Sequence, residues 1–335
     1  MSIINRIKFF IKRVRVSNYS KFRIGQNSGV GAHSRIQFSA DHGTGGDQSI
    51  TIGNNAGVGR NCELHVWDNN HIVIKDHATL NDGCKILGDV IIERYCLLSA
   101  NIFASSGNHY AFDYPTHLIK DQDKKILSTK KGRNEHSQQI RIEEDCWIGY
   151  GVFIKQGISI GRGAVIGANS VVLKNVEPYS VQAGIPCKEI KKRFNFEPLS
   201  QVLATNDDHL PYFYRGFGHK QEELESSRKQ GVINATSEVI VVLKNMSGVK
   251  GIHLTGKGNS EGELVISLKD KYQWNLKFTT QDLDVVLNIS NASELSEKSK
   301  TVFNSLPKEL QMHGIVTFIT SGDNQFGVKT IAIYE

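Results

Sequence analysis

The sequence of 335 residues lacks features that would assign it to several common classes of protein. No apolar run approaches the ~20 residues of a membrane-spanning helix, and the apolar part of the N-terminus is too interrupted for a signal peptide. The five cysteines form no Cys-x-x-Cys pair. Four of them occupy small interior positions of a repeat, as buried fillers, which fits a reducing cytoplasm: Cys62, Cys84, Cys96 and Cys146.

Acidic residues are absent from the first 40 positions. This segment carries eight basic residues: Arg6, Lys8, Lys12, Arg13, Arg15, Lys21, Arg23 and Arg35. The formal net charge is +6 and the rest of the chain is nearly neutral, so the basic excess is a local arm and not a nucleic-acid-binding face. Residues 1–22 are predicted to be a basic amphipathic cap, because solenoids need covered ends. A membrane-surface anchor is the alternative.

A period of six residues organises the chain from Ile142 to Val172. Aliphatic residues recur at this spacing without a slip: Ile142, Ile148, Ile154, Ile160, Ile166 and Val172. The residues four positions later are small or apolar: Cys146, Val152, Ile158, Ala164 and Ser170. Neither a helix nor a strand produces this period. A coil of three short strands does, because each face turns one aliphatic residue inward, so the pattern predicts a hexapeptide-repeat parallel β-helix.

The same period extends toward the N-terminus as far as Ile24, with two interruptions that matter. A step of ten residues separates Leu64 from Ile74, which predicts a short loop at one corner of the coil. The period then stops for residues 104–139, and an excursion of this length inside a compact solenoid is usually functional or disordered. We therefore predict an all-β protein whose β-helix domain spans 23–194, with a long loop at 104–139.

The C-terminal part of the chain has a different pattern. Residues 195–218 are irregular and aromatic and are predicted to be a linker, and 219–230 a short helix. From residue 237 apolar and polar residues alternate in seven or so segments, as is typical of half-buried antiparallel strands. Residues 219–335 are therefore predicted to be a smaller β-rich accessory domain resembling a β-sandwich. We find no catalytic motif in it.

Three motifs stand out in the repeat region: GNHYAFD, EEDCWIGYGVFIKQGISIGRGAVIGANSVVLKNV and AGIPCKEIKKRF. With them, residues 22–194 resemble the hexapeptide-repeat acetyltransferases, in particular the O-acetyltransferases that act on sugars and capsular polysaccharides. The resemblance implies a left-handed β-helix and acetyl-coenzyme A as acetyl donor, with no metal. It also implies a homotrimer with active sites between neighbouring prisms.

His109 in GNHYAFD matches the catalytic histidine of the family. A sugar hydroxyl is a poor nucleophile until a base takes its proton, and imidazole is suited to that role near neutral pH. His117 and His136 in the same loop are the alternative bases. Asp113 is predicted to orient the ring, with Glu143 and Glu144 as competitors for that role.

Trp147 lies between two inward positions of the repeat, so its side chain is predicted to point outward. The resemblance implies that it packs against the coenzyme and the acceptor near the thioester, and plain trimer contact is the alternative. The resemblance likewise implies a set of coenzyme-binding residues along the later coils: Trp147, Gly149, Gly167, Ala168, Lys174, Gly184, Pro186, Lys191, Lys192 and Arg193. The family often has Asn-Pro-Ala where this chain has Ile185-Pro186-Cys187.

His65, His71 and His77 are six residues apart, and related prisms hold zinc with histidines of adjacent coils. Catalytic zinc needs three protein ligands. The ten-residue step after Leu64 moves the three out of one row, so a metal site is not expected. No covalent intermediate is expected either, because Cys146 points inward and Cys187 lies in the turn assigned to the coenzyme.

The sequence therefore predicts an acetyl-coenzyme A-dependent O-acetyltransferase that acetylates a hydroxyl of a capsular or lipopolysaccharide glycan by direct transfer. N-acetylation of an amino sugar or nucleotide sugar is the alternative reaction. A non-catalytic trimeric carbohydrate-binding scaffold is the alternative of another class. The expected partners are the glycan and two further copies of the chain, with no nucleic acid. The expected location is the cytoplasm, with a peripheral contact to the inner membrane or the polysaccharide assembly machinery left open.

Overall fold

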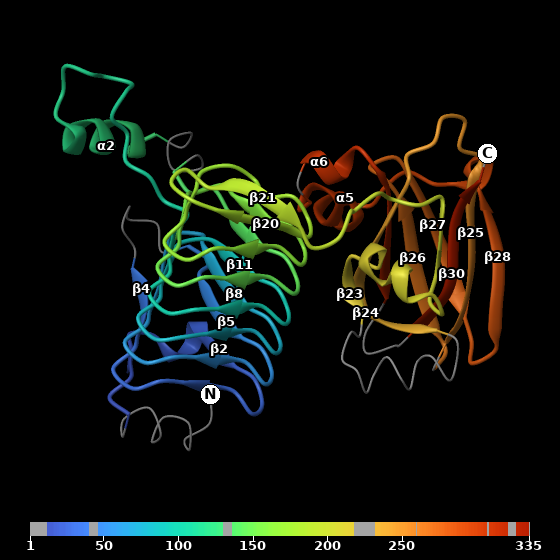
Figure 1. The fold of residues 1–335 in the computed structure, drawn as a ribbon, viewed down its shortest axis with the longest axis horizontal. Coiled ribbons are helices and arrows are strands. Elements are labelled where there is room, and N and C mark those ends of the chain that lie inside the picture. Colours follow the sequence, from blue (N-terminus) through green and yellow to red (C-terminus); the bar gives the residue numbers. More distant parts are fainter. Residues whose placement is uncertain are drawn as a thin grey trace. The chain divides into compact units, whose positions relative to one another are not determined.

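The computed structural model describes residues 12–39, 46–129, 136–217, 232–258, 260–306, 308–320 and 326–334. The chain divides into two compact units, residues 1–195 and 196–335. Figure 1 shows the first as a stack of coils and the second as a sheet with two short helices. Among the described residues, no helix has the length and apolar character that crossing a membrane would require.

Three sheets, parallel except for the last strand β21, form the walls of a triangular prism in the first unit. In the described residues sheet A holds β1 (Arg15–Val16), β4 (Arg35–Ser39), β7 (Glu63–Trp67), β10 (Lys85–Leu87), β13 (Phe103–Ser105), β16 (Phe153–Ile154) and β19 (Val171–Val172). Sheet B holds β2 (Phe22–Ile24), β5 (Ser49–Ile52), β8 (His71–Ile74), β11 (Val90–Ile92), β14 (Ile140–Ile142) and β17 (Ser159–Ile160). Sheet C holds β3 (Gly29–Val30), β6 (Gly57–Val58), β9 (Thr79–Leu80), β12 (Leu97–Leu98), β15 (Trp147–Ile148), β18 (Val165–Ile166), β20 (Ser180–Ala183) and β21 (Lys188–Lys192).

The aliphatic residues of the six-residue period fill the inside of the prism. Ile148, Ile154 and Ile160 lie on three successive walls and are fully buried, and Ile148 pairs in register with Ile166 of the next coil. The cysteines of the repeat are buried beside them. This arrangement confirms the predicted left-handed β-helix. It arises because each wall must bury one side chain per hexapeptide to remove it from water.

The long insertions all leave the prism at the corner between sheets A and B. β4 and β5, β7 and β8, and β13 and β14 are joined there, and the last of these connections is the loop of residues 106–139. Within that loop, α2 (Ile119–Leu127) projects from the coils in Figure 1. The ten-residue step predicted a corner loop correctly, since residues 68–70 turn between β7 and β8.

The coils begin earlier than the sequence predicted. β1 pairs with β4, and η1 (Tyr19–Lys21) leads directly into β2. Residues 15–22 therefore belong to the β-helix and not to a cap, because Arg15 and Val16 continue the ladder of sheet A. Residues 1–11 of the predicted cap lie outside the described residues.

The second unit is a single antiparallel sheet in the residues described. Its strands are β22 (Gln201–Leu203), β23 (Arg215–Phe217), β24 (Ile233–Leu243), β25 (Gly251–Gly258), β26 (Gly262–Leu268), β27 (Tyr272–Phe278), β28 (Asp282–Asn288), β29 (Gly314–Thr320) and β30 (Phe326–Tyr334). Helical segments are η2 (Asp207–Tyr212), η3 (Ile289–Asn291), α5 (Glu297–Asn304) and α6 (Lys308–Gln311). Val302 and Phe303 of α5 pack with Ile240 and Ile315 of the strands in one buried cluster.

Two predictions for this part of the chain are wrong. The strands form one sheet and not the two sheets of a sandwich, since one face is covered by α5 and α6, whose apolar residues were not recognised as helical. Residues 195–218 are not a linker, because β22 pairs with β30 and β23 with β24. The helix predicted at 219–230 lies outside the described residues.

Candidate active site

The loop that carries His109 is held at its root by a small hydrogen-bonded network. Ser106 is fully buried, and its hydroxyl accepts from the Asp89 N–H at 2.7 Å and contacts the Ser137 hydroxyl. Gly107 and Ser137 form an antiparallel bridge. The Gln156 side-chain amide is oriented so that its nitrogen faces the loop. In this orientation it donates to the backbone carbonyls of Ser106 and Gly107. The two ends of the loop are therefore fixed to the coils.

Helix α2 folds back onto the start of the loop through two side chains. Asp123 accepts from the Tyr110 N–H at 2.7 Å with Oδ1 and contacts His109 Nδ1 at 2.7 Å with Oδ2. Gln122 is buried. Its Oε1 accepts from the Tyr114 N–H at 3.0 Å, and its Nε2 donates to the His117 carbonyl at 3.1 Å. Both residues lie on one helical turn, so this part of the loop has a defined conformation.

The partner of the catalytic candidate differs from the one we predicted. Asp113 was expected to orient the ring, but Asp123 holds Nδ1. A helix of nine residues inside the loop brings Asp123 back to His109 across 14 positions, and no local spacing shows this. With Nδ1 bonded to a carboxylate, the neutral tautomer leaves Nε2 as an acceptor. The side chain of His109 is 81% exposed, so Nε2 is open to a ligand.

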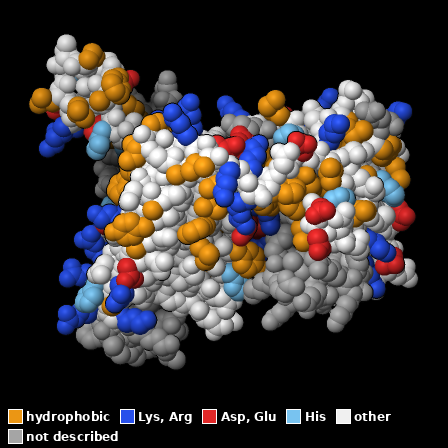
Figure 2. Space-filling view, viewed as in Figure 1, with side chains coloured by type: hydrophobic (Ala, Val, Ile, Leu, Met, Phe, Trp, Pro, Cys, Tyr) orange, Lys and Arg blue, Asp and Glu red, His pale blue; other side chains and the backbone are white. Residues whose placement is uncertain are grey.

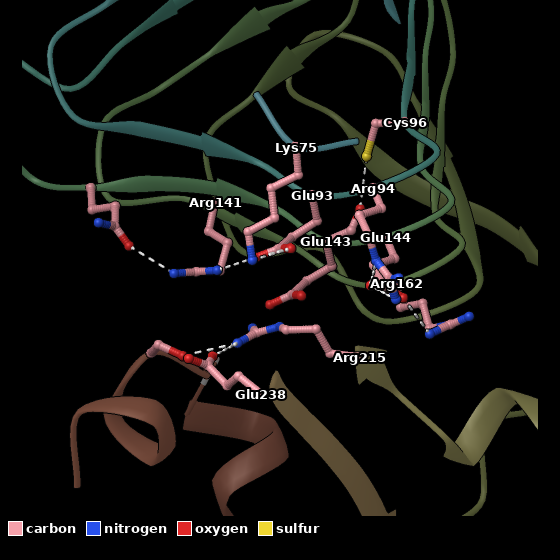
Figure 3. A network of polar contacts seen from close by, with 12 residues as sticks. Lys75, Glu93, Arg94, Cys96, Arg141, Glu143, Glu144, Arg162, Arg215 and Glu238 are labelled. Carbon is pink, nitrogen blue, oxygen red and sulfur yellow. Dashed lines mark hydrogen bonds and ion pairs between the residues drawn. The ribbon is translucent and has the colours of Figure 1, made fainter. Parts of the chain in front are cut away.

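Glu144, one of the two competing carboxylates, is paired elsewhere, as Figure 3 shows. Glu144 lies between Arg94 at 2.8 Å and Arg162 at 3.0 Å, and all three side chains are largely buried. Glu143 is fully buried, and its backbone carbonyl accepts from the Cys96 thiol. Neither is the partner of His109, because both sit at the corner between sheets B and C.

A cavity of about 440 Å³ opens beside His109 on the outer side of sheet A. Trp67 and His65 of β7, Phe153 of β16 and His136 of the loop contribute to its lining. Its size lies within the range of small-ligand sites, roughly 300–1,000 Å³. His136, one of the alternative bases, lines this cavity together with His109, whereas His117 contacts Tyr114 within the loop.

Trp147 occupies a different side of the prism. It is 54% exposed on β15 of sheet C, which confirms the predicted outward orientation. In register with it stand Leu97 and Val165, and Val181 continues the row. His109 leaves the corner between sheets A and B, which is opposite the sheet C wall. One copy of the prism therefore does not bring His109 and Trp147 together.

Most of the residues assigned to the coenzyme lie along sheet C and its corner with sheet A. Gly149 precedes β16, and Ala168 lies beside it in the next coil. A Cβ on Gly149 would stand 2.6 Å from Ala168 N, so glycine here is required by the stacking of the coils. Gly167 packs similarly against Ala183, with 2.7 Å between the two Cβ positions.

The C-terminal end of this face carries the basic candidates. Lys191 and Lys192 are exposed on β21, which pairs with β20. Gly184, at φ +104°, starts the turn between these strands, and the Ile185–Pro186 bond is cis. Lys174 is exposed just beyond β19. Lys174 thus lies at the corner between sheets A and B, apart from Gly184, Lys191 and Lys192 on the side of sheet C.

Arg193 differs from the neighbouring lysines, because it already has partners in the coils. Its Nη1 donates to the Gly163 carbonyl at 2.7 Å and lies 3.4 Å from Asp145. The guanidinium therefore ties the end of the β-helix domain to an earlier coil.

The three histidines weighed as zinc ligands lie apart. His65 is on sheet A and bonds to Ser39, and His71 is on sheet B and bonds to Ser49. His77 stacks on Tyr95 at the next corner. In the part of the chain that the structure describes, no three His, Cys, Asp or Glu side chains are grouped so that they could hold a metal ion.

Cys96, Cys146 and Cys187 are poorly placed for nucleophilic chemistry. Burial raises the pKa of the Cys96 thiol, and desolvation also raises the pKa of Cys187 in the turn after Pro186. Cys146 is buried inside the prism. A thiolate is the reactive form, so these environments disfavour a covalent cysteine intermediate.

The repeat itself matches a known family model, described as the hexapeptide repeat of succinyl-transferase, over residues 139–174. A probable macrolide acetyltransferase of Lysinibacillus sphaericus is 36% identical over 135 residues, which are 38% of this chain and 74% of that protein. A putative lipopolysaccharide biosynthesis O-acetyl transferase, WbbJ, of Escherichia coli strain K12 is 31% identical over 153 residues, or 45% and 75% of the two chains. This chain belongs to the hexapeptide-repeat acetyltransferase family.

Membership of the hexapeptide-repeat acetyltransferases confirms the predicted family, the acyltransferase class and acetyl-coenzyme A as donor. A solved galactoside acetyltransferase in complex with coenzyme A is 26% identical, with 57% of this chain and 72% of that one covered and a TM-score of 0.29. The matched repeat includes Trp147, Gly149, Gly167, Ala168 and Lys174, whereas the loop that carries His109 precedes it.

Proposed function

We propose that this hexapeptide-repeat acetyltransferase transfers acetyl from acetyl-coenzyme A to a hydroxyl of a cell-surface glycan, with His109 as general base. The observation that carries the proposal is the His109–Asp123 pair, 2.7 Å apart, at the side of the cavity on sheet A. Asp123 binds His109 Nδ1, so in the neutral ring Nε2 is the nitrogen that can accept a proton. The named relative WbbJ, an O-acetyl transferase of lipopolysaccharide biosynthesis, supports a sugar hydroxyl as acceptor.

The site in this proposal is completed by a second copy of the chain in a homotrimer. His109 and Trp147 lie at opposite sides of one prism, and the coenzyme candidates accompany Trp147. Both sides carry exposed apolar side chains. Phe112 of the loop is 91% exposed, and Leu97 and Trp147 are exposed on sheet C. Figure 2 shows such side chains on the prism and on the lobe that carries α2. Neighbouring copies would cover these surfaces.

The chemistry follows from the groups that the two copies contribute. His109 Nε2 accepts the proton of the acceptor hydroxyl as that oxygen attacks the thioester carbonyl. The tetrahedral oxyanion is stabilised by N–H donors near Trp147. The carbon–sulfur bond then breaks, and the thiolate leaves with the proton that His109 returns. Asp123 keeps the ring in one tautomer throughout.

Release of free thiol from acetyl-coenzyme A in the presence of a glycan panel tests this proposal. The product should lose its acetate in mild alkali, because an ester is cleaved under conditions that leave an amide intact. Acetate that resists alkali would favour the N-acetylation alternative. The enzyme proposal would fail if no acceptor caused thiol release and coenzyme A did not change the melting temperature. The alternative of a non-catalytic scaffold would then be favoured.

Substitution of Asp123 by asparagine is expected to lower kcat by about 10- to 100-fold, because the amide no longer fixes the tautomer and position of the ring. The KM for acetyl-coenzyme A should change little, since Asp123 contacts only the loop. Steady-state kinetics with both substrates varied measures this split. Asp121→Asn, an exposed position in the same helix, is the matched control. Equal losses in both variants would contradict the role given to Asp123.

A contact with the inner face of the membrane stays a prediction. The described N-terminal coils carry Arg13, Arg15, His33 and Arg35 around a second cavity of about 430 Å³. Figure 2 shows Lys and Arg side chains gathered toward this end of the prism. Such a surface would attract anionic lipid headgroups.

A further inference from the structure

We infer that the acceptor is an anionic sugar, one that bears a carboxylate or a phosphate, and that the cavity beside His109 recognises its charge through Lys155 and its oxygens through Trp67. The inference rests on the proposed function, because it names the class of acceptor for the same site. It comes from the groups that line the cavity.

The described residues that line the cavity include basic side chains but no acidic ones. Among the described residues that line it there is no aspartate or glutamate, while Lys155 and three histidines contribute. Asp123 is already bound to His109 and to Tyr110 N–H. Lys155 is exposed, and no ion pair joins it to a carboxylate within the described chain. An ammonium group beside a cavity without acids favours an anionic ligand.

Trp67 provides the second, independent observation. Its indole is 9% exposed and lines the cavity, and its Nε1 is buried without an acceptor among the described residues. A buried donor without a partner is unfavourable, so an acceptor oxygen is expected from a ligand. A sugar hydroxyl or an acid oxygen in the cavity would supply it.

The packing around the indole shows that its position is built into the fold. A Cβ on Gly107 would stand 2.7 Å from Trp67 Cζ2, and one on Gly88 2.9 Å from Cη2. Glycine at both positions makes room for the ring. His65 packs edge-on against it, with ring centroids 5.6 Å apart. The ring is therefore held in a fixed place beside the cavity.

The floor of the cavity suits a pyranose ring. Phe103 and Phe153 lie in adjacent coils and stack with centroids 5.6 Å apart and planes 5° from parallel. Together they give the cavity an apolar wall, against which the C–H groups of a sugar can pack. The cavity therefore combines the apolar rings of Phe103 and Phe153 with two polar groups, the Trp67 indole N–H and the Lys155 ammonium. Small-ligand sites commonly have this composition.

The test compares one neutral acceptor with two anionic ones. Methyl glucuronide and glucose 6-phosphate are offered with acetyl-coenzyme A against methyl glucoside, and kcat/KM is measured for each. The wild type should prefer at least one anionic acceptor. Lys155→Ala should reduce the preference about 10- to 100-fold, and Trp67→Phe, which keeps a ring but removes the N–H, should lower kcat/KM about 2- to 10-fold. Melting temperatures identify any variant that has lost its fold.

Lys85→Ala is the matched control, because Lys85 is an exposed lysine of sheet A, in register with Phe103, that does not line the cavity. It should leave the preference unchanged. Equal use of neutral and anionic acceptors, with no effect of Lys155→Ala, would overturn the inference while acetyl transfer stands.

Failure of the proposed function would look different, because no acceptor would be acetylated. Calorimetry with the same three sugars then still decides the inference. Anionic sugars that bind the wild type and bind Lys155→Ala more weakly would support it, and absence of binding would overturn it.

Discussion

Replacement of His109 by alanine is expected to lower kcat by about 10²–10⁴-fold, which is the usual contribution of a positioned general base. The melting temperature should not change, because the side chain is 81% exposed and its recorded bond is the one to Asp123. Thiol release under saturating acetyl-coenzyme A and acceptor measures the effect. Binding of coenzyme A should persist, since His109 is not among the residues assigned to the coenzyme.

His117→Gln is the control for this result. His117 lies in the same loop and was the other candidate base along with His136, but its ring stacks on Tyr114 away from the cavity. It should retain most of the activity. A variant without His109 that turned over at the wild-type rate in a folded trimer would show that another group accepts the proton.

Mixed trimers are expected to recover activity that neither parent has. His109→Ala and Trp147→Ala should each be strongly impaired, because each removes one side of a shared site. When the two chains are co-expressed at equal levels, about a quarter of the interfaces pair an intact His109 with an intact Trp147 of the neighbouring copy, if assembly is random and cyclic. Activity should rise to about a quarter of the wild-type value.

His109→Ala mixed with Asp123→Asn provides the matched control. These two residues bond within one copy, so no assembly of the two chains restores an intact pair. Activity should not rise above the average of the parents. Recovery in this control, or none in the His109 and Trp147 mixture, would contradict a site shared between copies.

The prism could be predicted in detail because its pattern is local. Ile148, Ile154 and Ile160 each face inward at a spacing set by one hexapeptide per wall, and all three are buried. The outward position of Trp147 followed from its two inward neighbours. In the C-terminal unit the alternation correctly indicated antiparallel strands, but it could not show that α5 and α6 cover a single sheet.

The site was only half predictable for a physical reason. His109 and the coenzyme candidates lie in motifs that are continuous in sequence. Asp123 reaches His109 through the fold of a helix inside the loop, and Asp113, which is closer in sequence, does not. The cavity likewise joins Trp67, Phe103 and Phe153, which belong to different coils. Contacts between residues of different coils depend on how the insertions at the corner between sheets A and B pack on one another.

The sequence by itself determined the β-helix and its inward residues, because short-range spacing encodes them. Its continuous motifs carried the resemblance to the family and pointed to the histidine in the long loop. Only the tertiary structure decided which carboxylate holds His109, which indole lines the cavity, and that His109 and Trp147 lie on opposite sides of one prism. Those relations arise when distant coils close into walls and corners, and no period along the chain records them.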